Sequence, residues 1–174
     1  WLRRHVGVML QDAWIVSDTV EENIRLRDPA ISSEQIRTAA DAVGASKFIE
    51  RLPDGYATVL AERGANLSTG QKQLIALARV AAFNPEIVLV MDEATASIDP
   101  ETEEIIQAGL NRVMAGRTAI IIAHRLNTIR AVDRIIVLHL GEVVEDGSHE
   151  ELVALGGVYA RLYELQYQVQ AGTS

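Results

Sequence analysis

The chain contains no cysteine among its 174 residues, which excludes disulfide bridges and cysteine-ligated metal sites. No apolar run approaches the ~20 residues needed to span a bilayer, so we expect this segment to be soluble or peripheral to a membrane. The net charge of −8 argues against general nucleic-acid binding, because attraction to phosphates needs basic patches. The sequence also lacks a Gly-x-x-x-x-Gly-Lys-Ser/Thr phosphate loop.

The second half of the sequence has the pattern of an α/β protein. Ile87–Met91 is a continuous apolar run without alternation, as in strands that are covered on both faces. Thr118–Ala123 and Arg134–Leu140 are two further predicted strands, and a helix is expected from Pro100 to Gly116. We predict a mostly parallel sheet with right-handed crossovers and flanking helices.

The first half is predicted to be mainly helical after a short strand at Val6–Leu10. Ser32, three residues before a Gln, fits a capping box at the start of a helical segment that reaches Arg51. A second helix is expected from Gly70 to Asn84. We therefore expect a helical subdomain and a further helix over about residues 12–84, and the C-terminal part of the α/β core over about 85–174.

Two carboxylates, Asp92 and Glu93, follow the predicted strand Ile87–Met91. Ligands of open α/β sheets bind beyond the carboxyl ends of the strands, where Asp92 could organise Mg²⁺. Glu93 would point elsewhere, since successive strand side chains alternate, and could polarise an attacking water. The alternative is an ordinary solvated strand end.

The residues Ser68, Thr69, Gly70 and Gln71 stand at the predicted start of the second helix. Its open N–H groups and its dipole favour an anion such as phosphate, and the Ser68 hydroxyl could add a donor. The alternative for Ser68 is an ordinary N-cap that stabilises the helix by about 1 kcal/mol.

Two further polar residues follow predicted strands. His124 comes directly after Thr118–Ala123, where its imidazole could contact a γ-phosphate and orient water. Gln11 follows the first strand and could help to ligate Mg²⁺ or to position water. The alternative for His124 is a strand-end histidine that donates to a nearby carbonyl, and Gln11 alone indicates almost nothing.

In this order, the motifs resemble those of the nucleotide-binding domains of ATP-binding cassette (ABC) transporters. Leu67 to Gln71 is similar to the signature motif, and Ile87–Asp92 to the Walker B strand, with Glu93 as the catalytic carboxylate. The resemblance makes Ser97-Ile98-Asp99 the D-loop, with Asp99 communicating between two ATP sites. It makes His124 the switch histidine and Gln11 the Q-loop glutamine.

The resemblance is closest to the exporter type. Ala61-Glu62-Arg63-Gly64 is similar to the X-loop of exporters. Thr69 departs from the family pattern, which often has a second Gly there, and we expect a helix start to accept it. The missing Walker A loop lies upstream of Gln11 in family members, so we expect an N-terminally truncated sequence.

The resemblance implies a partial RecA-like P-loop NTPase core and an ATPase with ATP and Mg²⁺ as cofactors. Two such domains would dimerise head to tail around ATP, beside the transmembrane domain of the same transporter at the cytoplasmic face of the membrane. The fragment alone would be inactive without Walker A. An alternative is a non-catalytic module that supplies only the signature face to a partner's ATP site. A soluble cassette ATPase of the repair or translation type is a third interpretation, disfavoured by the Glu62-Arg63-Gly64 element.

Overall fold

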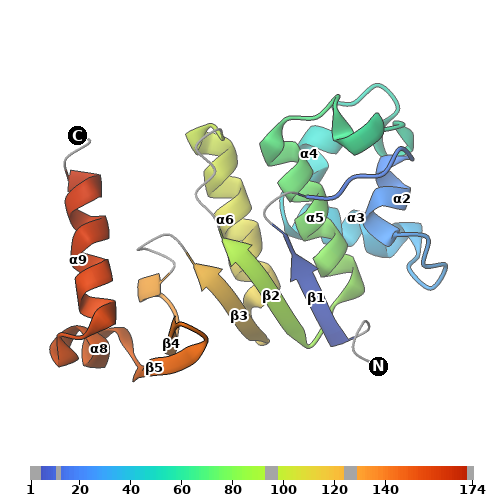
Figure 1. The fold of residues 1–174 in the computed structure, drawn as a ribbon. Coiled ribbons are helices and arrows are strands. Elements are labelled where there is room, and N and C mark those ends of the chain that lie inside the picture. Colours follow the sequence, from blue (N-terminus) through green and yellow to red (C-terminus); the bar gives the residue numbers. More distant parts are fainter. Residues whose placement is uncertain (1–4, 11–12, 93–97, 124–128, 172–174) are drawn as a thin grey trace. The chain divides into compact units, whose positions relative to one another are not determined.

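The structure is a computed structural model that describes residues 5–10, 13–92, 98–123 and 129–171. The chain divides into two compact units, one of residues 1–91 and 95–122 and the other of residues 92–94 and 123–174. Both contain helices and strands (Figure 1). The predicted α/β class is confirmed.

A three-stranded sheet lies in the first unit, in the order β1 (Val6–Met9), β2 (Ile87–Asp92) and β3 (Thr118–Ala123). β1 and β2 are parallel, with Val6 opposite Ile87 and Met9 opposite Val90. The three arrows point the same way in Figure 1. The predicted strands are therefore present, and the sheet joins segments about 80 residues apart.

The helices of this unit begin and end close to the expected positions. The capping box predicted at Ser32 is present, with reciprocal hydrogen bonds to Gln35, and the Asn84 end of the second predicted helix is also confirmed. The short helix α2 was not predicted; it begins after Thr19, whose hydroxyl accepts the Glu22 N–H. The unit contains α2 (Val20–Arg25), α3 (Ser33–Ala42), α4 (Ser46–Ile49), η1 (Gly55–Ala57), η2 (Glu62–Gly64), α5 (Thr69–Phe83) and α6 (Pro100–Met114).

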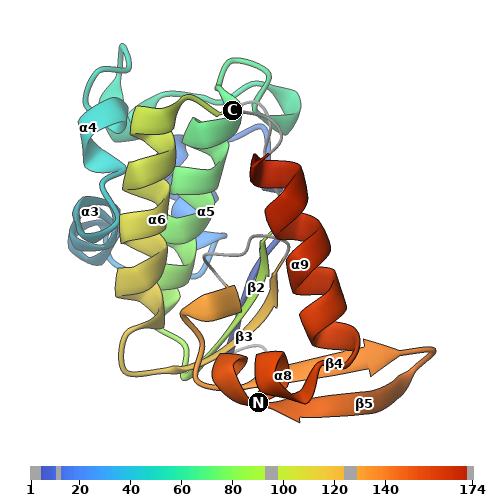
Figure 2. The same ribbon diagram turned by 90° about the vertical axis from the view of Figure 1, so that its left-hand side faces the viewer.

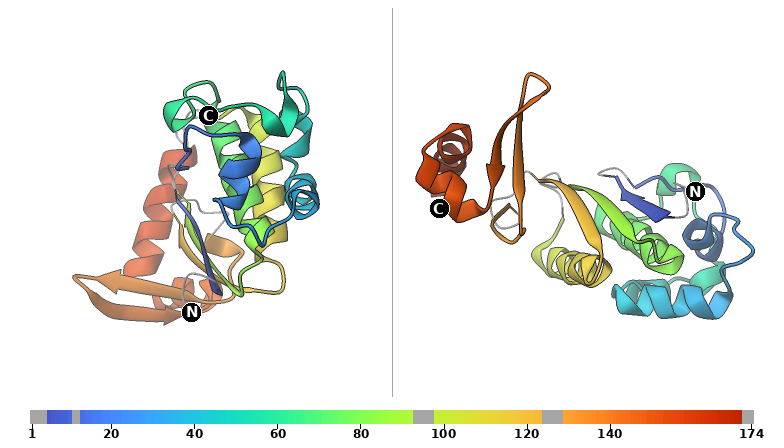
Figure 3. Two further views of the ribbon diagram at one scale, coloured as in Figure 1. Left: turned by 90° about the vertical axis from the view of Figure 1, so that its right-hand side faces the viewer. Right: turned by 90° about the horizontal axis from the view of Figure 1, so that it is seen from below.

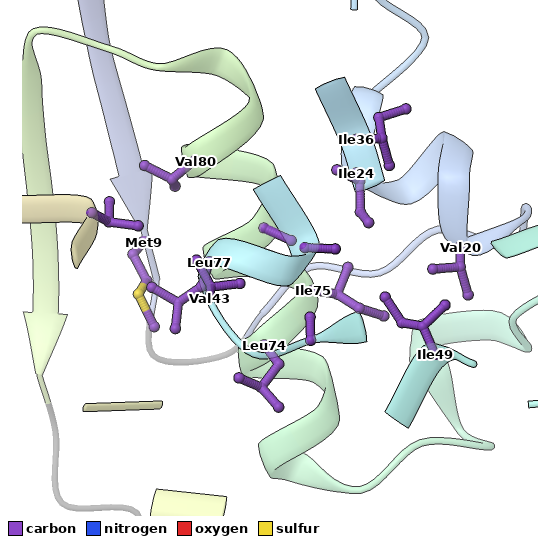
Figure 4. Close-up of a cluster of buried hydrophobic side chains, with 14 of the residues drawn as sticks. Met9, Val20, Ile24, Ile36, Val43, Ile49, Leu74, Ile75, Leu77 and Val80 are labelled. Atoms are coloured by element: carbon purple, nitrogen blue, oxygen red, sulfur yellow. The ribbon is translucent and has the colours of Figure 1, made fainter. Parts of the chain in front are cut away.

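Helix α5 is the centre of the hydrophobic core. Residues 73–78 of α5 are all buried, and Ile75 and Leu77 are fully buried. Their neighbours include Ile24 of α2 and Ile36 of α3 (Figure 4). α5 and α6 cover the same face of the sheet, as Figures 2 and 3 show. Each such buried aliphatic side chain contributes roughly 1.5–3 kcal/mol, so the position of α5 is strongly fixed.

The second unit contains an antiparallel hairpin and two helices. β4 (Ile135–His139) pairs with β5 (Glu142–Gly147), and α8 (His149–Leu155) and α9 (Val158–Ala171) follow. This corrects one detail, because the strand at Arg134–Leu140 was expected to continue the mostly parallel sheet, whereas β4 pairs antiparallel with β5. The two-residue connection between His139 and Glu142 is too short for a crossover, so the next strand returns antiparallel. No helix in the described part of the chain is long and apolar enough to cross a membrane.

Candidate nucleotide-binding surface

The start of α5 is closed by a reciprocal capping box. The Ser68 hydroxyl accepts the Gln71 N–H at 3.2 Å, and the Gln71 side-chain oxygen accepts the Ser68 N–H at 3.0 Å. Ser68 has extended backbone angles, as an N-cap requires. The N-cap interpretation of Ser68 is therefore confirmed, and Thr69 is accommodated as the first helical residue.

The cap leaves anion-binding capacity at the helix start. A hydroxyl that accepts one hydrogen bond can still donate its proton. The N–H groups of Thr69 and Gly70 have no hydrogen-bond partner in the described part of the chain, as expected for the first turn of a helix. Ser68 and Thr69 are exposed. Gly70 itself is buried, so the exposed donors are the Ser68 hydroxyl and the Thr69 N–H, at the end where the dipole of a 15-residue helix favours negative charge.

Gly70 brings the first turns of α5 and α6 into close contact. A Cβ at Gly70 would overlap the Thr102 Cγ2 methyl and lie 3.5 Å from Ile98 Cγ2. Only glycine permits this approach without displacing Thr102. The predicted signature and D-loop segments are therefore adjacent, although Gly70 and Ile98 are 28 positions apart in the sequence.

Asp99 is the N-cap of α6. Its carboxylate accepts the Thr102 N–H at 2.9 Å, and Pro100 occupies the first helical position. The hydrogen bonds from the Thr102 backbone and side chain lower the pKa of Asp99 below its ordinary value, so the carboxylate is charged at neutral pH. Asp99 is exposed, and its structural task is to order the start of α6.

A second group of predicted elements meets around Ile15. A Cβ at Gly64 would lie 3.3 Å from the Ile15 side chain and 3.1 Å from Lys72 Cε. Two backbone hydrogen bonds join the neighbouring residues of these segments, one from the Leu60 N–H to the Asp18 carbonyl and one from the Val20 N–H to the Thr58 carbonyl. The Glu62-Arg63-Gly64 element, which resembles that of exporters, therefore lies against the segment that follows Gln11.

Several predicted site residues fall outside the described residues, namely Gln11, Glu93 and His124. Asp92 is the last residue of β2, at the carboxyl end of that strand. No group of three or more His, Asp or Glu side chains in the described ranges could hold a metal ion. The predicted Mg²⁺ ligands Asp92 and Gln11 and the predicted catalytic roles stay predictions.

Two functional candidates were missed in the sequence. Asn23 is fully buried, and Arg79 of α5 donates to the Asn23 carbonyl and to the Trp14 carbonyl, both at 2.9 Å. Arg79 is the only charged residue between Gln73 and Phe83, a signal that was available in the sequence. Its backbone partners could not be predicted without the fold.

Comparison with known proteins extends this picture. The family model described as ABC transporter matches residues 1–96. An uncharacterised ABC transporter ATP-binding protein of Bacillus subtilis, YknV, is 52% identical over 166 residues, which cover 95% of this chain and 27% of that protein. The toxin RTX-I translocation ATP-binding protein of Actinobacillus pleuropneumoniae is 48% identical over 167 residues, covering 95% of this chain and 24% of its own length.

The fold is similar to that of a solved exporter. The structure of a bacterial Atm1-family ABC exporter with ATP bound matches with a TM-score of 0.83 and 41% sequence identity, over 95% of this chain and 29% of that one. The architecture thus defines an α/β nucleotide-binding domain with a partial P-loop NTPase fold. The chain belongs to the ABC transporter family, among ATP-binding proteins of the exporter type. It spans about a quarter of the length of the curated relatives named above.

Proposed function

We propose that this chain is part of the ATP-binding and ATP-hydrolysing domain of an ABC exporter, which powers the translocation of a substrate across a membrane. The observation that carries the proposal is the contact of Gly70 with Thr102, which presents an open helix N-terminus beside the Asp99 cap. The exporter relatives support it further.

The phosphates of ATP fit the start of α5. The exposed Ser68 hydroxyl and Thr69 N–H are donors, the buried Gly70 follows them in the first turn, and a helix start is a general anion site. Gln71 holds Ser68 in its capping geometry. We propose that these four residues contact the γ-phosphate of ATP held by a second nucleotide-binding domain, in a head-to-tail dimer, and that Asp99 links the two sites.

The remaining machinery would surround the ATP of this chain's own site. Asp92 at the end of β2, together with Gln11, would hold Mg²⁺ through oxygen ligands, which this ion prefers. Mg²⁺ supplies neutralisation of the phosphate charge in phosphoryl transfer. Glu93 would polarise the attacking water, and His124 would hold the γ-phosphate in position, because such catalysis consists mainly of positioning and charge stabilisation.

The membrane-facing side of this unit would be the surface around Ile15 and Gly64. The segment after Gln11 and the Glu62-Arg63-Gly64 element are in contact there, and both would sense the transmembrane domain. The complete protein would accordingly act at the cytoplasmic face of the membrane. The division near residue 84 into a helical part and the α/β core stays a prediction within this proposal.

A pair of mixed dimers tests which subunit's ATP the signature contacts. In the full-length protein, Ser68→Asp places a carboxylate beside the phosphates, and Glu93→Gln removes the base. Dimers with one mutation in each subunit keep one intact site if the signature acts across the interface. Dimers with both mutations in one subunit and none in the other keep no intact site. Two affinity tags allow each dimer to be isolated, and ATP hydrolysis is measured in lipid nanodiscs.

We expect residual hydrolysis when the two mutations are on different subunits and almost none when they share one subunit. The reverse result would show that Ser68 acts in its own subunit's site. A wild-type dimer that neither binds nor hydrolyses ATP would instead favour the non-catalytic module.

A further inference from the structure

Arg79 is a half-buried cation on α5. Burial lowers its pKa to about 10, which still leaves the guanidinium protonated at neutral pH. No ion pair of Arg79 with a carboxylate is present in the part of the chain that the structure describes. A buried charge without a counter-ion is costly, and an apolar side chain would fill the same space without that cost. The presence of an arginine at this position therefore needs an explanation, and its hydrogen bonds provide one.

The guanidinium bridges two separate backbone carbonyls. Its Nε donates to the Asn23 carbonyl on α2, and one terminal nitrogen donates to the Trp14 carbonyl, each at 2.9 Å. These donors diverge in the fixed plane of the guanidinium, an arrangement that a lysine ammonium does not reproduce. Arg79 thus joins α5 to the segment of residues 13–18.

The side chain of Asn23 forms hydrogen bonds with the same segment. Its side-chain oxygen accepts the Val16 N–H at 2.9 Å, and its amide donates to the carbonyls of Val16 at 3.0 Å and Thr19 at 2.9 Å. The side chain is fully buried. Arg79 and Asn23 therefore form one hydrogen-bond network, in which their side chains hold the backbone N–H and carbonyl groups of residues 14–19.

The hydrogen-bond network connects the segment around Trp14 with helix α5, which begins at the Ser68 cap. At one end, the Trp14 side chain is 61% exposed, and the segment follows Gln11. At the other end, Ser68 lies 11 positions before Arg79 on the same helix, about three turns and roughly 16 Å along its axis. Eleven residues return to nearly the same side of a helix. A displacement of the segment would therefore reach the start of α5 along a single helix.

We infer that Arg79 is a positioning residue that couples the segment of residues 13–18 to the signature end of α5. This inference rests on the proposed function for its catalytic consequence, but its structural part stands without it. The two Arg79 bonds hold the segment and the helix as one body. When the segment moves, Ser68 moves with it toward or away from the phosphates.

The test compares Arg79→Lys and Arg79→Gln with Arg112→Lys in the full-length protein in nanodiscs. Arg112 is the matched control: it also donates to a distant backbone carbonyl, that of Ala42, at 2.8 Å, but at the contact of α6 with α3. Hydrogen exchange followed by mass spectrometry reports the protection of residues 13–19. ATP titrations give kcat and KM separately.

We expect exchange of residues 13–19 to rise at least threefold in both Arg79 variants, with residues 73–78 still protected. We expect kcat to fall at least fivefold with KM for ATP within twofold, while Arg112→Lys changes neither quantity. Unchanged exchange in 13–19, or faster exchange with normal kcat, would overturn the coupling. Loss of protection throughout α5 in both variants would assign Arg79 a merely structural role and also overturn it. If the wild-type protein hydrolyses no ATP, the proposed function fails, whereas the exchange result still decides whether Arg79 holds the segment.

Discussion

Gly70 and Thr102 lie so close that a methyl group on Gly70 would overlap the Thr102 methyl. The contact joins the first turn of α5 to the first turn of α6. It also sets the spacing between the Ser68 cap and the Asp99 cap, because each cap belongs to one of these turns. The proposed phosphate-binding segment and the Asp99 segment therefore depend on one glycine for their spacing.

Gly70→Ala should destabilise the contact between α5 and α6 by about 1–3 kcal/mol, the usual cost of overpacking. Thr102→Ser removes the clashing methyl and keeps the hydroxyl that bonds Asp99. We expect the double variant to recover most of the lost stability and ATP hydrolysis. Local opening free energies of residues 69–75, measured by native-state hydrogen exchange of the full-length protein, complete the double-mutant cycle. Additive effects would show that the methyl groups do not meet.

Ser68→Asp should separate helix capping from phosphate binding. Aspartate caps helices about as well as serine, so we expect local stability within about 0.5 kcal/mol of wild type. Its negative charge would repel the γ-phosphate, and ATP hydrolysis should fall at least tenfold.

The matched control for this change is Ser32→Asp. Ser32 forms the same capping box with a glutamine at the start of α3, and we expect hydrolysis to be unchanged there. Equal losses at both positions, measured as ATPase rates, would mean that Ser68 acts only through its cap.

Glu93→Gln should leave ATP binding intact and slow hydrolysis at least tenfold, because an amide cannot accept the proton of the attacking water. Equilibrium nucleotide binding and single-turnover hydrolysis by the full-length protein measure the two quantities. Glu104→Gln, on an exposed position of α6, is the control and should behave like the wild type. Near-normal turnover of the Glu93 variant would reject Glu93 as the base.

Asp99 should make the stability of the start of α6 depend on pH. Its pKa is lowered in the folded state by bonds from Thr102, so the charged cap stabilises the fold above the ordinary pKa of aspartate, about 3.9. The contribution is lost as the pH falls through the lower, folded-state pKa. Asp99→Asn keeps a capping side chain but cannot titrate.

We expect hydrogen exchange of residues 102–105 to be slower in the wild type than in Asp99→Asn at neutral pH. This difference should begin to shrink below about pH 4 and disappear as the pH falls through the lower, folded-state pKa, after correction for intrinsic exchange rates. Asp54→Asn is the control, since Asp54 precedes η1 without a side-chain capping bond. A wild-type advantage that persisted in acid would contradict the charged cap.

Local sequence signals predicted many of the elements. Ser32 with Gln35 marked the start of α3, and Pro100 and Gly116 bracketed α6, because caps and helix breakers act within a few residues of themselves. The pairing partner of β4 was not predicted, because such local signals do not specify partners. An apolar run fixes a strand but not its partner, and the short connection to β5 decided the antiparallel pairing.

Only part of the candidate site could be predicted from the sequence. Ser68 to Gln71 and Asp99 were found from their chemistry and from the family resemblance. The contact between Gly70 and Thr102 was not, because it joins residues 32 positions apart through the packing of two helices.

By itself, the sequence determined the caps at Ser32 and Ser68, most strand positions and the family, since each depends on short stretches of residue types. Only the tertiary structure decided what Arg79 does. A lone arginine in an apolar helix predicts burial or a partner, but backbone carbonyls carry no residue identity. The fold alone brings the carbonyls of Asn23 and Trp14 to Arg79, because core packing around α5 sets the distances between segments that are far apart in the chain.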